Sequence, residues 1–217
     1  MSAEKITSPV GELEWVTIAG KGKPNMSGKL EYKVDVVLEG EQAEALKKLI
    51  DDFWADNKPN KVKKPKSLGY YPHKVLTDEK DEDGDPIWEE DGKTAFVFKT
   101  GTTFKDGNAK TIPVYNAKGA EVSLSKKQIG NGSRGRVQGA MDIYEVKSEA
   151  GKTQSAGVSL YLNGLQLAKF VEYKGGVNFD GLDAEYGDFE GFEDDGMDAI
   201  NDDENVSDTD AGDKVKI

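Results

Sequence analysis

Alternating apolar and polar residues are the main structural signal in the first 176 residues of the chain. Between Leu30 and Leu38 every second side chain is apolar and most of those between are charged, which is the period of a strand with one buried face. Less regular alternation predicts further strands at Leu13–Ile18, Thr94–Phe104, Thr111–Tyr115, Arg134–Val146 and Val158–Tyr173. Gly164 interrupts the last run and predicts a kink or a bulge there.

A single helix is predicted from Glu41 to Ala55. Its apolar residues recur at the spacing of one helical face, and Glu41 and Glu44 place negative charge in the first turn, where the helix dipole favours it. The apolar residues are Ala43, Leu46, Leu49, Ile50, Phe53 and Trp54. Such a face is more typical of a helix that packs on a sheet than of one that forms a groove for a partner. With about five strands, the pattern predicts a small β-barrel with one capping helix.

Acidic residues are concentrated at the C-terminal end of the chain. The 217 residues carry 41 Asp and Glu and 29 Lys and Arg, a net charge of −12. Residues 177–217 hold 15 of the acids and 2 of the bases, which leaves 26 acids and 27 bases, or +1, for residues 1–176. We therefore predict a folded domain over 1–176 and an acidic, disordered tail over 177–217. A solubilising appendage and an interaction tail that imitates a nucleic-acid backbone are equally compatible with this composition.

The composition excludes several classes of site. The chain has no cysteine, so disulfides, cysteine-ligated zinc and a thiol nucleophile are excluded. His73 is the single histidine, which leaves little for a histidine metal site or an acid–base triad. No apolar run approaches the roughly 20 residues of a membrane helix, and the first residues lack the apolar core of a signal peptide. We expect a soluble intracellular protein that has no cofactor, no metal and no membrane contact, and that is not an enzyme.

Two segments match the spelling of ligand-binding motifs but not their context. Gly130–Gly135 reads GxGxxG, yet an alternating strand follows it where a dinucleotide site needs a helix. The acidic stretch Glu79–Glu90 has the length of a calcium loop, but it begins with Glu, contains Pro86 and lacks flanking helices. We expect a turn at the first segment and a solvated hairpin tip, within the acidic residues 78–91, at the second.

The remaining candidate chemistry is the binding of a single-stranded nucleic acid, which needs cations along the backbone and exposed aromatic rings on which bases stack. Arg134, Arg136 and Tyr144 are predicted on one face of a strand, and the preceding glycine turn would bring the arginines close to a phosphate backbone. Candidate cations on the other strands and loops are Lys29, Lys33, Lys99, Lys105 and Lys110. Alternation turns the aromatic residues Tyr32, Phe96 and Phe98 into the core instead.

Short motifs in a fixed order resemble the T7-type bacteriophage single-stranded DNA-binding proteins. They are Lys5–Gly11, Tyr32–Asp35, Phe96–Lys99 with Phe104, Ile129–Ser133 with the strand to Tyr144, Gly157–Leu160 and Gln166–Leu167, followed by Gly175–Gly176 and the acidic tail. Together they cover nearly the whole chain. The chain departs from the family pattern at Gly101, in place of an aromatic residue, and at Lys214–Ile217, in place of an acidic run that ends in an aromatic residue.

The resemblance implies an OB-fold, which is an all-β, five-stranded Greek-key barrel, here with one capping helix. It also implies binding of single-stranded DNA without strong sequence preference, in phage DNA replication and recombination in the cytoplasm of the infected bacterium. Lys5, Lys29 and Lys99 would then contact DNA as cations, and Tyr144 would contact it as a stacking ring.

The resemblance assigns partner contacts to the acidic tail. The tail would mediate contacts in a homodimer and would bind the phage DNA polymerase and helicase–primase. A tethered tail also acts at a high effective concentration, so it would compete with DNA for the cationic groove of its own barrel. The tail residues with which we associate these contacts are Asp188, Phe189, Phe192, Asp194, Asp195, Asp202 and Asp203.

Two other classes of protein stay open from the residues alone. One is a virion structural or assembly protein, whose β-barrel docks a basic partner through the acidic tail. The other is an acidic mimic of DNA that inhibits a nuclease, for which a near-neutral, strand-rich body is less suited. Binding of single-stranded DNA would distinguish a DNA-binding protein from both of these classes.

Overall fold

Nine strands and one helix make up the part of the chain that the computed structural model describes, which is residues 3–25, 27–124 and 127–173. The predicted tail, residues 177–217, lies outside the described residues together with its seven proposed contact residues. In chain order the elements are β1 (Glu4–Thr7), β2 (Gly11–Thr17), β3 (Lys23–Pro24), β4 (Leu30–Leu38), α1 (Gly40–Asn57), β5 (Tyr70–Lys80), β6 (Pro86–Gly101), β7 (Val114–Tyr115), β8 (Ser133–Lys147) and β9 (Thr153–Lys169).

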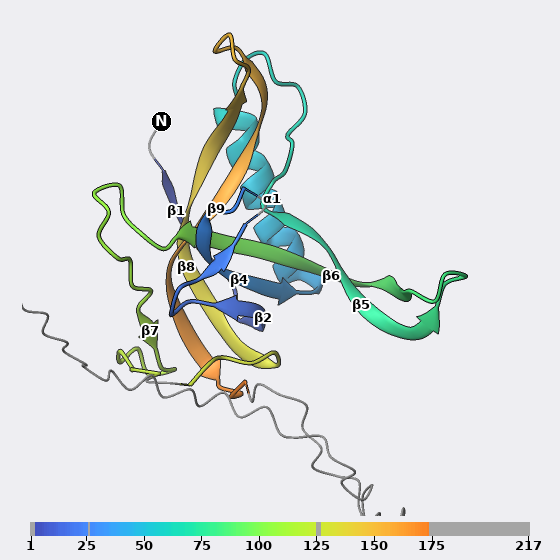
Figure 1. Ribbon diagram of the computed structural model, residues 1–217, viewed down its shortest axis with the longest axis vertical. Helices are drawn as coiled ribbons and strands as arrows, with labels where there is room; N and C mark the ends of the chain where they lie inside the picture. Colours follow the sequence, from blue (N-terminus) through green and yellow to red (C-terminus); the bar gives the residue numbers. More distant parts are fainter. Residues whose placement is uncertain (1–2, 26, 125–126, 174–217) are drawn as a thin grey trace, which may run out of the picture. The chain divides into compact units, whose positions relative to one another are not determined.

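Five of these strands close into a barrel (Figure 1). Strands β2, β4 and β6 pair antiparallel in succession, and β9 joins β6 in parallel. Strand β8 completes the circle because it pairs antiparallel with β9 on one side and with β2 on the other. The fifth barrel strand thus lies between the third and the fourth, which is the strand order of an OB-fold. The predicted fold class is confirmed.

Inward-facing apolar side chains fill the barrel as the alternation predicts. Phe96 and Phe98 on β6 are completely buried, and so are Leu13 on β2 and Met141 on β8. Tyr32 is also buried, and its hydroxyl donates a hydrogen bond of 2.9 Å to the carbonyl oxygen of Gly20. The aromatic residues that the sequence assigns to the core are therefore core residues.

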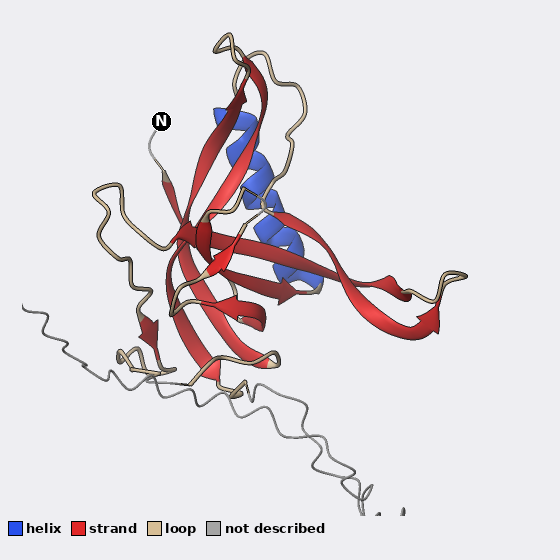
Figure 2. Ribbon diagram, in the orientation of Figure 1, coloured by secondary structure: helices blue, strands red, loops and turns tan. Residues whose placement is uncertain are grey.

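Helix α1 packs against the strands and shares their core (Figure 2). It begins one residue before the predicted start and ends two residues after the predicted end. The buried residues of the helix are Ala43, Leu46, Ile50, Phe53 and Trp54. Leu49 was expected on the same face, but it is exposed. In the described part of the chain, no helix has the length and apolar character of a membrane span.

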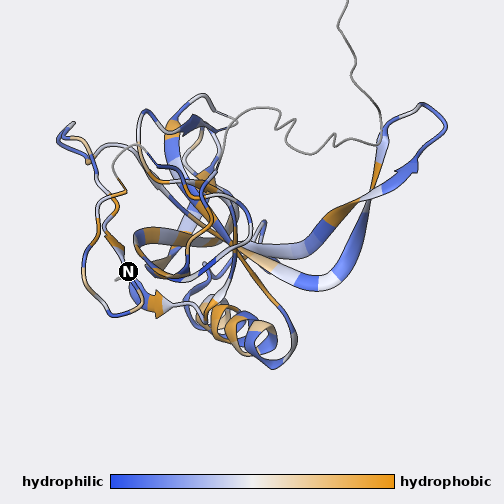
Figure 3. Ribbon diagram, turned by 90° about the horizontal axis from the view of Figure 1, so that it is seen from below, coloured by the Kyte–Doolittle hydropathy of each residue, from blue (hydrophilic) through white to orange (hydrophobic). Residues whose placement is uncertain are grey.

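Two hairpins extend beyond the barrel (Figure 1). One is the end of β8 and the start of β9, which lies beside α1. The other, which we call the β5–β6 arm, consists of residues 70–91 and is hydrophilic at its tip (Figure 3). The sequence predicted only a solvated tip over residues 78–91, whereas the structure pairs Lys74 with Glu90 and Leu76 with Trp88 in extended strands. Between residues 74 and 90 both faces of the arm meet solvent, so its strands lack the alternation by which buried strands are recognised there.

A bulge in β9 lets the long β8–β9 pair bend around the barrel. Gln138 pairs with Gly164 while its neighbour Gly139 pairs with Leu162, so Asn163 has no partner across the ladder. The kink or bulge predicted at Gly164 is confirmed, and it increases the local twist that closure of a small barrel requires.

Gly139 is a position at which the barrel has no room for a side chain. A Cβ atom there would lie far inside the contact distance of the Tyr161 carbonyl oxygen and would also meet Phe98. We expect Gly139→Ala to lower the free energy of unfolding by about 2 kcal/mol or more, or the melting temperature by about 4–8 °C. Gly101→Ala on β6 is the matched control, since its Cβ meets only Thr103 at 3.6 Å. Equal melting temperatures for the two variants would contradict this packing.

Candidate functional site

Three lysines and a tyrosine from four strands form one row on the outside of the barrel. Lys33 on β4 pairs with Lys99 on β6, and Lys99 pairs with Tyr161 on β9. Tyr161 pairs with Ala140 on β8, and Ala140 pairs with Lys5 on β1. Neighbouring strands lie about 4.8 Å apart, so this lysine row (Lys5, Lys33, Lys99 and Tyr161) spans roughly 19 Å. The closed sheet thus assembles cations that are far apart in the sequence.

The side chains of the row point away from the core and toward solvent. Their neighbours along the strands, Phe98 and Leu160, are buried, whereas Lys5 and Lys99 are exposed. The ring of Tyr161 is 39% exposed, and Ala140 beside it is too small to cover it. Two lysines directly opposite each other repel, so the Lys33–Lys99 pair weakens the sheet unless an anion lies over it.

Asp35 compensates part of this charge from a buried position. Its side chain is buried, and one carboxylate oxygen accepts hydrogen bonds from Lys33 at 3.0 Å and from the Tyr71 hydroxyl at 2.8 Å. The other oxygen, Oδ1, is buried without a partner. Loss of solvation therefore raises the pKa of Asp35 above its ordinary value, although the Lys33 ammonium opposes the shift. The same carboxylate holds Lys33 and Tyr71 in place beside the row.

Arg134 and Arg136 lie on the same outer face of β8 but away from the row. They precede Ala140 by six and four residues, which corresponds to about 20 and 13 Å along the strand. Both are exposed, and Arg136 donates a hydrogen bond of 2.8 Å from Nε to Gln166. The structure therefore places the arginines as an extension of the cationic face, beyond the lysine row.

Tyr144 lies on the opposite side of the row from the arginines and is half-buried. It pairs with Gly157, and a Cβ atom on that glycine would lie 2.6 Å from the Tyr144 hydroxyl. The ring thus packs over the glycine, and burial raises the pKa of the hydroxyl. The structure does not bring Tyr144 together with Arg134 and Arg136, from which it is separated by about 26–33 Å along β8. Its predicted role as a stacking ring stays a prediction.

The other predicted cations lie in loops at the end of the barrel. Lys29 is exposed just before β4, and Lys105 is exposed in the loop after β6. Lys110 donates a hydrogen bond of 2.7 Å to Thr100, and its ammonium lies 5.0 Å from the centre of the Phe104 ring. Lys110 therefore has internal partners, whereas Lys29 and Lys105 extend toward solvent.

Sequence reasoning missed Tyr161 and Trp15, which are both exposed aromatic residues. The signal for Tyr161 was present, because alternation from Val158 to Leu162 turns residue 161 outward. Trp15 carries no such signal, since it was assigned only to a strand and its direction depends on a bulge in β2 between Glu14 and Thr17. Exposure of a tryptophan there follows from the tertiary structure alone.

His73 ties the β5–β6 arm to the barrel. The buried imidazole lies between two carboxylates, with Nε2 at 3.2 Å from Glu14 on β2 and Nδ1 at 3.0 Å from Asp91 on β6. The contact with Asp91 lacks hydrogen-bond geometry. In residues 3–25, 27–124 and 127–173 no cluster of His, Asp and Glu is arranged to hold a metal ion. The single histidine thus has a structural position.

The barrel is similar to two solved structures of phage proteins. One is gp2.5, a single-stranded DNA-binding protein encoded by bacteriophage T7, with a TM-score of 0.51 and 22% identity over 84% of this chain and 100% of that chain. The other is the single-stranded DNA-binding protein from bacteriophage Enc34 in complex with single-stranded DNA, with a TM-score of 0.51 and 14% identity over 79% and 89% of the two chains. The resemblance inferred from short motifs is confirmed at the level of the fold.

No protein-family model matches the chain, and no curated protein sequence does so either.

The buried carboxyl of Asp35 predicts a specific dependence of stability on pH. Because the pKa of Asp35 in the folded protein is raised above the ordinary value of 3.8, the folded protein binds more protons than the unfolded protein at a pH between these two pKa values. Its contribution to stability is therefore present at low pH and is lost as the pH rises from about 4 through the folded pKa. Asp35→Asn removes this titration, so the difference in free energy of unfolding, variant minus wild type, should grow over that window.

Urea unfolding of both proteins between pH 4 and pH 8 measures this difference. Asp52→Asn on α1 is the control, because it removes an equal charge from an exposed side chain. Parallel curves for the wild type and Asp35→Asn would mean that Asp35 does not titrate in the folded state as its burial implies.

Proposed function

We propose that this chain binds single-stranded DNA without strong sequence preference, as a binding protein and not as an enzyme. The observation that carries the proposal is the lysine row, in which Lys5, Lys33 and Lys99 flank the exposed Tyr161 on the outer face of an OB barrel. Cations that follow a backbone and a ring on which a base stacks are the two requirements of sequence-tolerant recognition. The fold shared with two phage single-stranded DNA-binding proteins supports the same assignment.

The geometry assigns a separate task to each side chain. The lysines attract consecutive phosphates, and the phosphates relieve the repulsion between Lys33 and Lys99. Tyr161 offers its ring face to a base, and any base can stack because each has a π-face. No side chain in the row is placed to read the edge of a particular base. Arg134 and Arg136 continue the cationic face for a longer strand.

Further proposals concern the protein's partners. The acidic tail, with 15 acids and 2 bases in residues 177–217, competes with DNA for the lysine row of a barrel that has a net charge of only +1. When DNA displaces it, the tail becomes available to the phage DNA polymerase and helicase–primase, or to a second copy of the chain. The protein acts in DNA replication and recombination in the cytoplasm of the infected bacterium. These steps rest on the sequence resemblance and on the charge distribution.

The salt dependence of binding tests the lysine row. Each lysine that contacts a phosphate contributes about 0.7 to the slope of log K against log salt concentration for a single strand. We therefore expect Lys99→Ala and Lys5→Ala each to make the slope shallower by about that amount, measured with a fluorescent oligo-dT by anisotropy. Lys48→Ala, an equal loss of charge from an exposed position on α1, is the matched control. If Lys99→Ala and Lys5→Ala have the same slope as the wild type and the Lys48→Ala control, the row does not contact DNA.

Removal of the tail tests the competition. A chain that ends at Gly176 should bind oligo-dT more tightly than the full chain at low salt, and the difference should shrink as salt screens the tail. The comparison is made by titration of the same oligonucleotide across a salt series. Equal affinity of the two chains would contradict competition while leaving DNA binding intact. An absence of binding by both would contradict the proposed function and favour a structural role.

A further inference from the structure

Trp15 occupies a backbone conformation that tryptophan rarely adopts. Its φ is 51°, and it is the one non-glycine residue with positive φ among the described residues. The residue lies in the β2 bulge between Glu14 and Thr17, where a left-handed residue is usually glycine. The amide N–H donates a hydrogen bond of 3.2 Å to Oδ1 of Asn131, in the turn before β8. Such conformations persist where the surrounding structure enforces them, and they cluster at functional sites.

The side chain of Trp15 does not pack in the core, so core packing does not offset the unfavourable backbone conformation. The side chain is 53% exposed, and within the described part of the chain it stacks on no other aromatic ring. Glycine, or asparagine, would suit the backbone better. An exposed tryptophan at a strained position is therefore unexplained by the stability of the fold.

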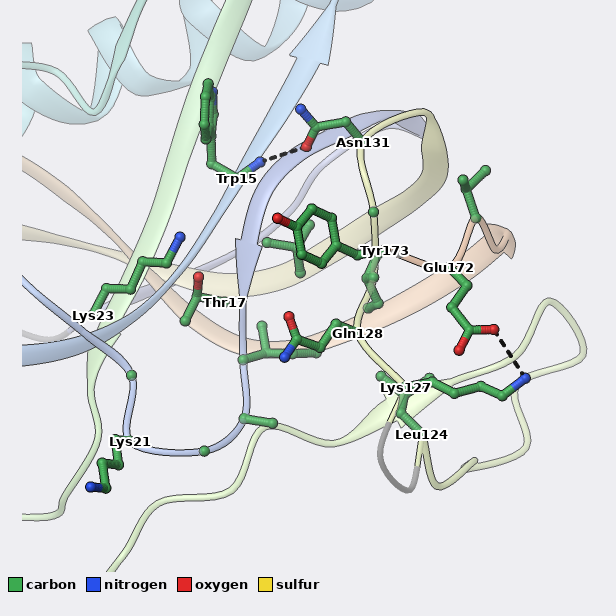
Figure 4. A pocket seen from close by; sticks show the side chains of 18 residues that line it. Trp15, Thr17, Lys21, Lys23, Leu124, Lys127, Gln128, Asn131, Glu172 and Tyr173 are labelled. Carbon is green, nitrogen blue, oxygen red and sulfur yellow. Dashed lines mark hydrogen bonds and ion pairs between the residues drawn. The ribbon is translucent and has the colours of Figure 1, made fainter. Parts of the chain in front are cut away.

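Two hollows meet at Trp15. The first, of about 910 Å³, lies between the end of β2, the turn before β8 and the residues after β9, and Figure 4 shows Trp15 and Asn131 at its rim with Tyr173 inside. Its lining holds Lys21, Lys23 and Lys127, and the last of these forms an ion pair of 3.2 Å with the one acid of the lining, Glu172. The second hollow, of about 490 Å³, lies between β2 and the base of the β5–β6 arm. Trp15 and Asn131 line both hollows, so the two hollows meet at these residues.

The second hollow is lined by further aromatic rings. Tyr71 and Trp88 of the arm face it, and both are exposed, as is Tyr173 of the first hollow. Lys74 adds a cation at the same place. A path from the first hollow to the second therefore passes Tyr173, then Trp15, and then Tyr71 and Trp88. Lysines lie at both ends of this path.

Both hollows adjoin the lysine row. Thr17, which lines the first, pairs directly with Lys33. Tyr71, which lines the second, bonds to Asp35, and the same carboxylate holds Lys33. The hollows thus adjoin the row. The first adds Lys21 and Lys23, whereas the lining of the second holds one lysine, Lys74, and one acid, Glu14. The row and the first hollow therefore supply the positive charge, which determines the class of occupant: a polyanion that carries flat rings.

We propose that Trp15 is a base-stacking residue of a second subsite for single-stranded DNA, in which the strand leaves the lysine row at Lys33 and crosses Trp15 with nucleotides in the two hollows. This inference rests on the proposed function and extends it. The positive φ at Trp15 is retained because it directs the indole outward between the hollows. Asn131, by accepting the N–H of Trp15, is a positioning residue for this ring.

The intrinsic fluorescence of the protein isolates Trp15 for a direct test. The chain has three tryptophans, of which Trp54 is only 6% exposed while Trp15 and Trp88 are 53% and 51% exposed. In the full-length Trp88→Phe variant, Trp15 is therefore the one exposed tryptophan. We expect oligo-dT to quench the fluorescence of this variant at the concentrations at which it binds, because a base stacks on the indole. Saturated binding without quenching would overturn the proposal.

Substitution of Trp15 separates its contribution to binding from its contribution to folding. We expect Trp15→Gly to weaken oligo-dT binding roughly five- to 150-fold, which is the range for loss of one stacking ring. The melting temperature should stay within a few degrees of the wild type or rise, because glycine accepts the positive φ. Trp15→Tyr keeps a ring and should retain most of the affinity. Leu49→Ala, which truncates an exposed apolar side chain on α1, should change neither quantity.

The outcomes for the two proposals differ. If the wild type binds oligo-dT with the expected dependence on Lys99 and Trp15→Gly binds equally well, the lysine row stands and the Trp15 subsite is overturned. If Trp15→Gly unfolds while Trp15→Tyr loses affinity and Trp88→Phe shows no quenching, Trp15 is a structural residue and the subsite is again overturned. If the wild type does not bind oligo-dT at low salt, both proposals fail.

Discussion

Closure of the sheet by β8 is the constraint on which the rest of the structure depends. Because β8 pairs with β9 and with β2 at once, the inner faces of five strands enclose a single core that contains Phe96, Phe98 and Met141. A closed sheet leaves no free edge within the barrel, and it fixes the register of every strand against two neighbours. The lack of space at Gly139 follows from this closure, since the bend of the β8–β9 pair brings backbone against backbone.

The same closure concentrates charge on the outside of the barrel. Lys33, Lys99 and Lys5 are adjacent because the registers of β4, β6, β9, β8 and β1 align them. Free energy favours such a row of like charges only when a polyanion or a nearby carboxylate is present. Asp35 supplies one carboxylate from below the surface, where its own burial is unfavourable. The barrel therefore keeps a surface whose electrostatic cost is offset by a ligand.

A second energetically unfavourable feature, the backbone conformation of Trp15, lies next to the row of like charges. The bulge in β2 holds Trp15 at a positive φ, where it lines the two hollows. Tyr71 of the arm donates a hydrogen bond to the Asp35 carboxylate, which also accepts one from Lys33. The histidine between Glu14 and Asp91 fixes the arm at the same edge of β2. Features that weaken an isolated barrel thus gather around one end of the lysine row, which is the distribution expected of a binding surface.

The sequence by itself determined the strand-rich barrel, the helix over 41–55, the burial of Tyr32, Phe96 and Phe98 and the bulge near Gly164, because each depends on the periodicity of a local run. It also identified lysines of the row as candidate cations. The tertiary structure alone decided which of them are adjacent, that Tyr144 packs over Gly157 apart from Arg134, and that Trp15 is exposed. Strand register and bulges set these distances, and they arise from pairing between separate segments. The paired residues are 13 apart in the sequence for Tyr144 and Gly157, 66 apart for Lys33 and Lys99, and 135 apart for Lys5 and Ala140, so no local pattern encodes them.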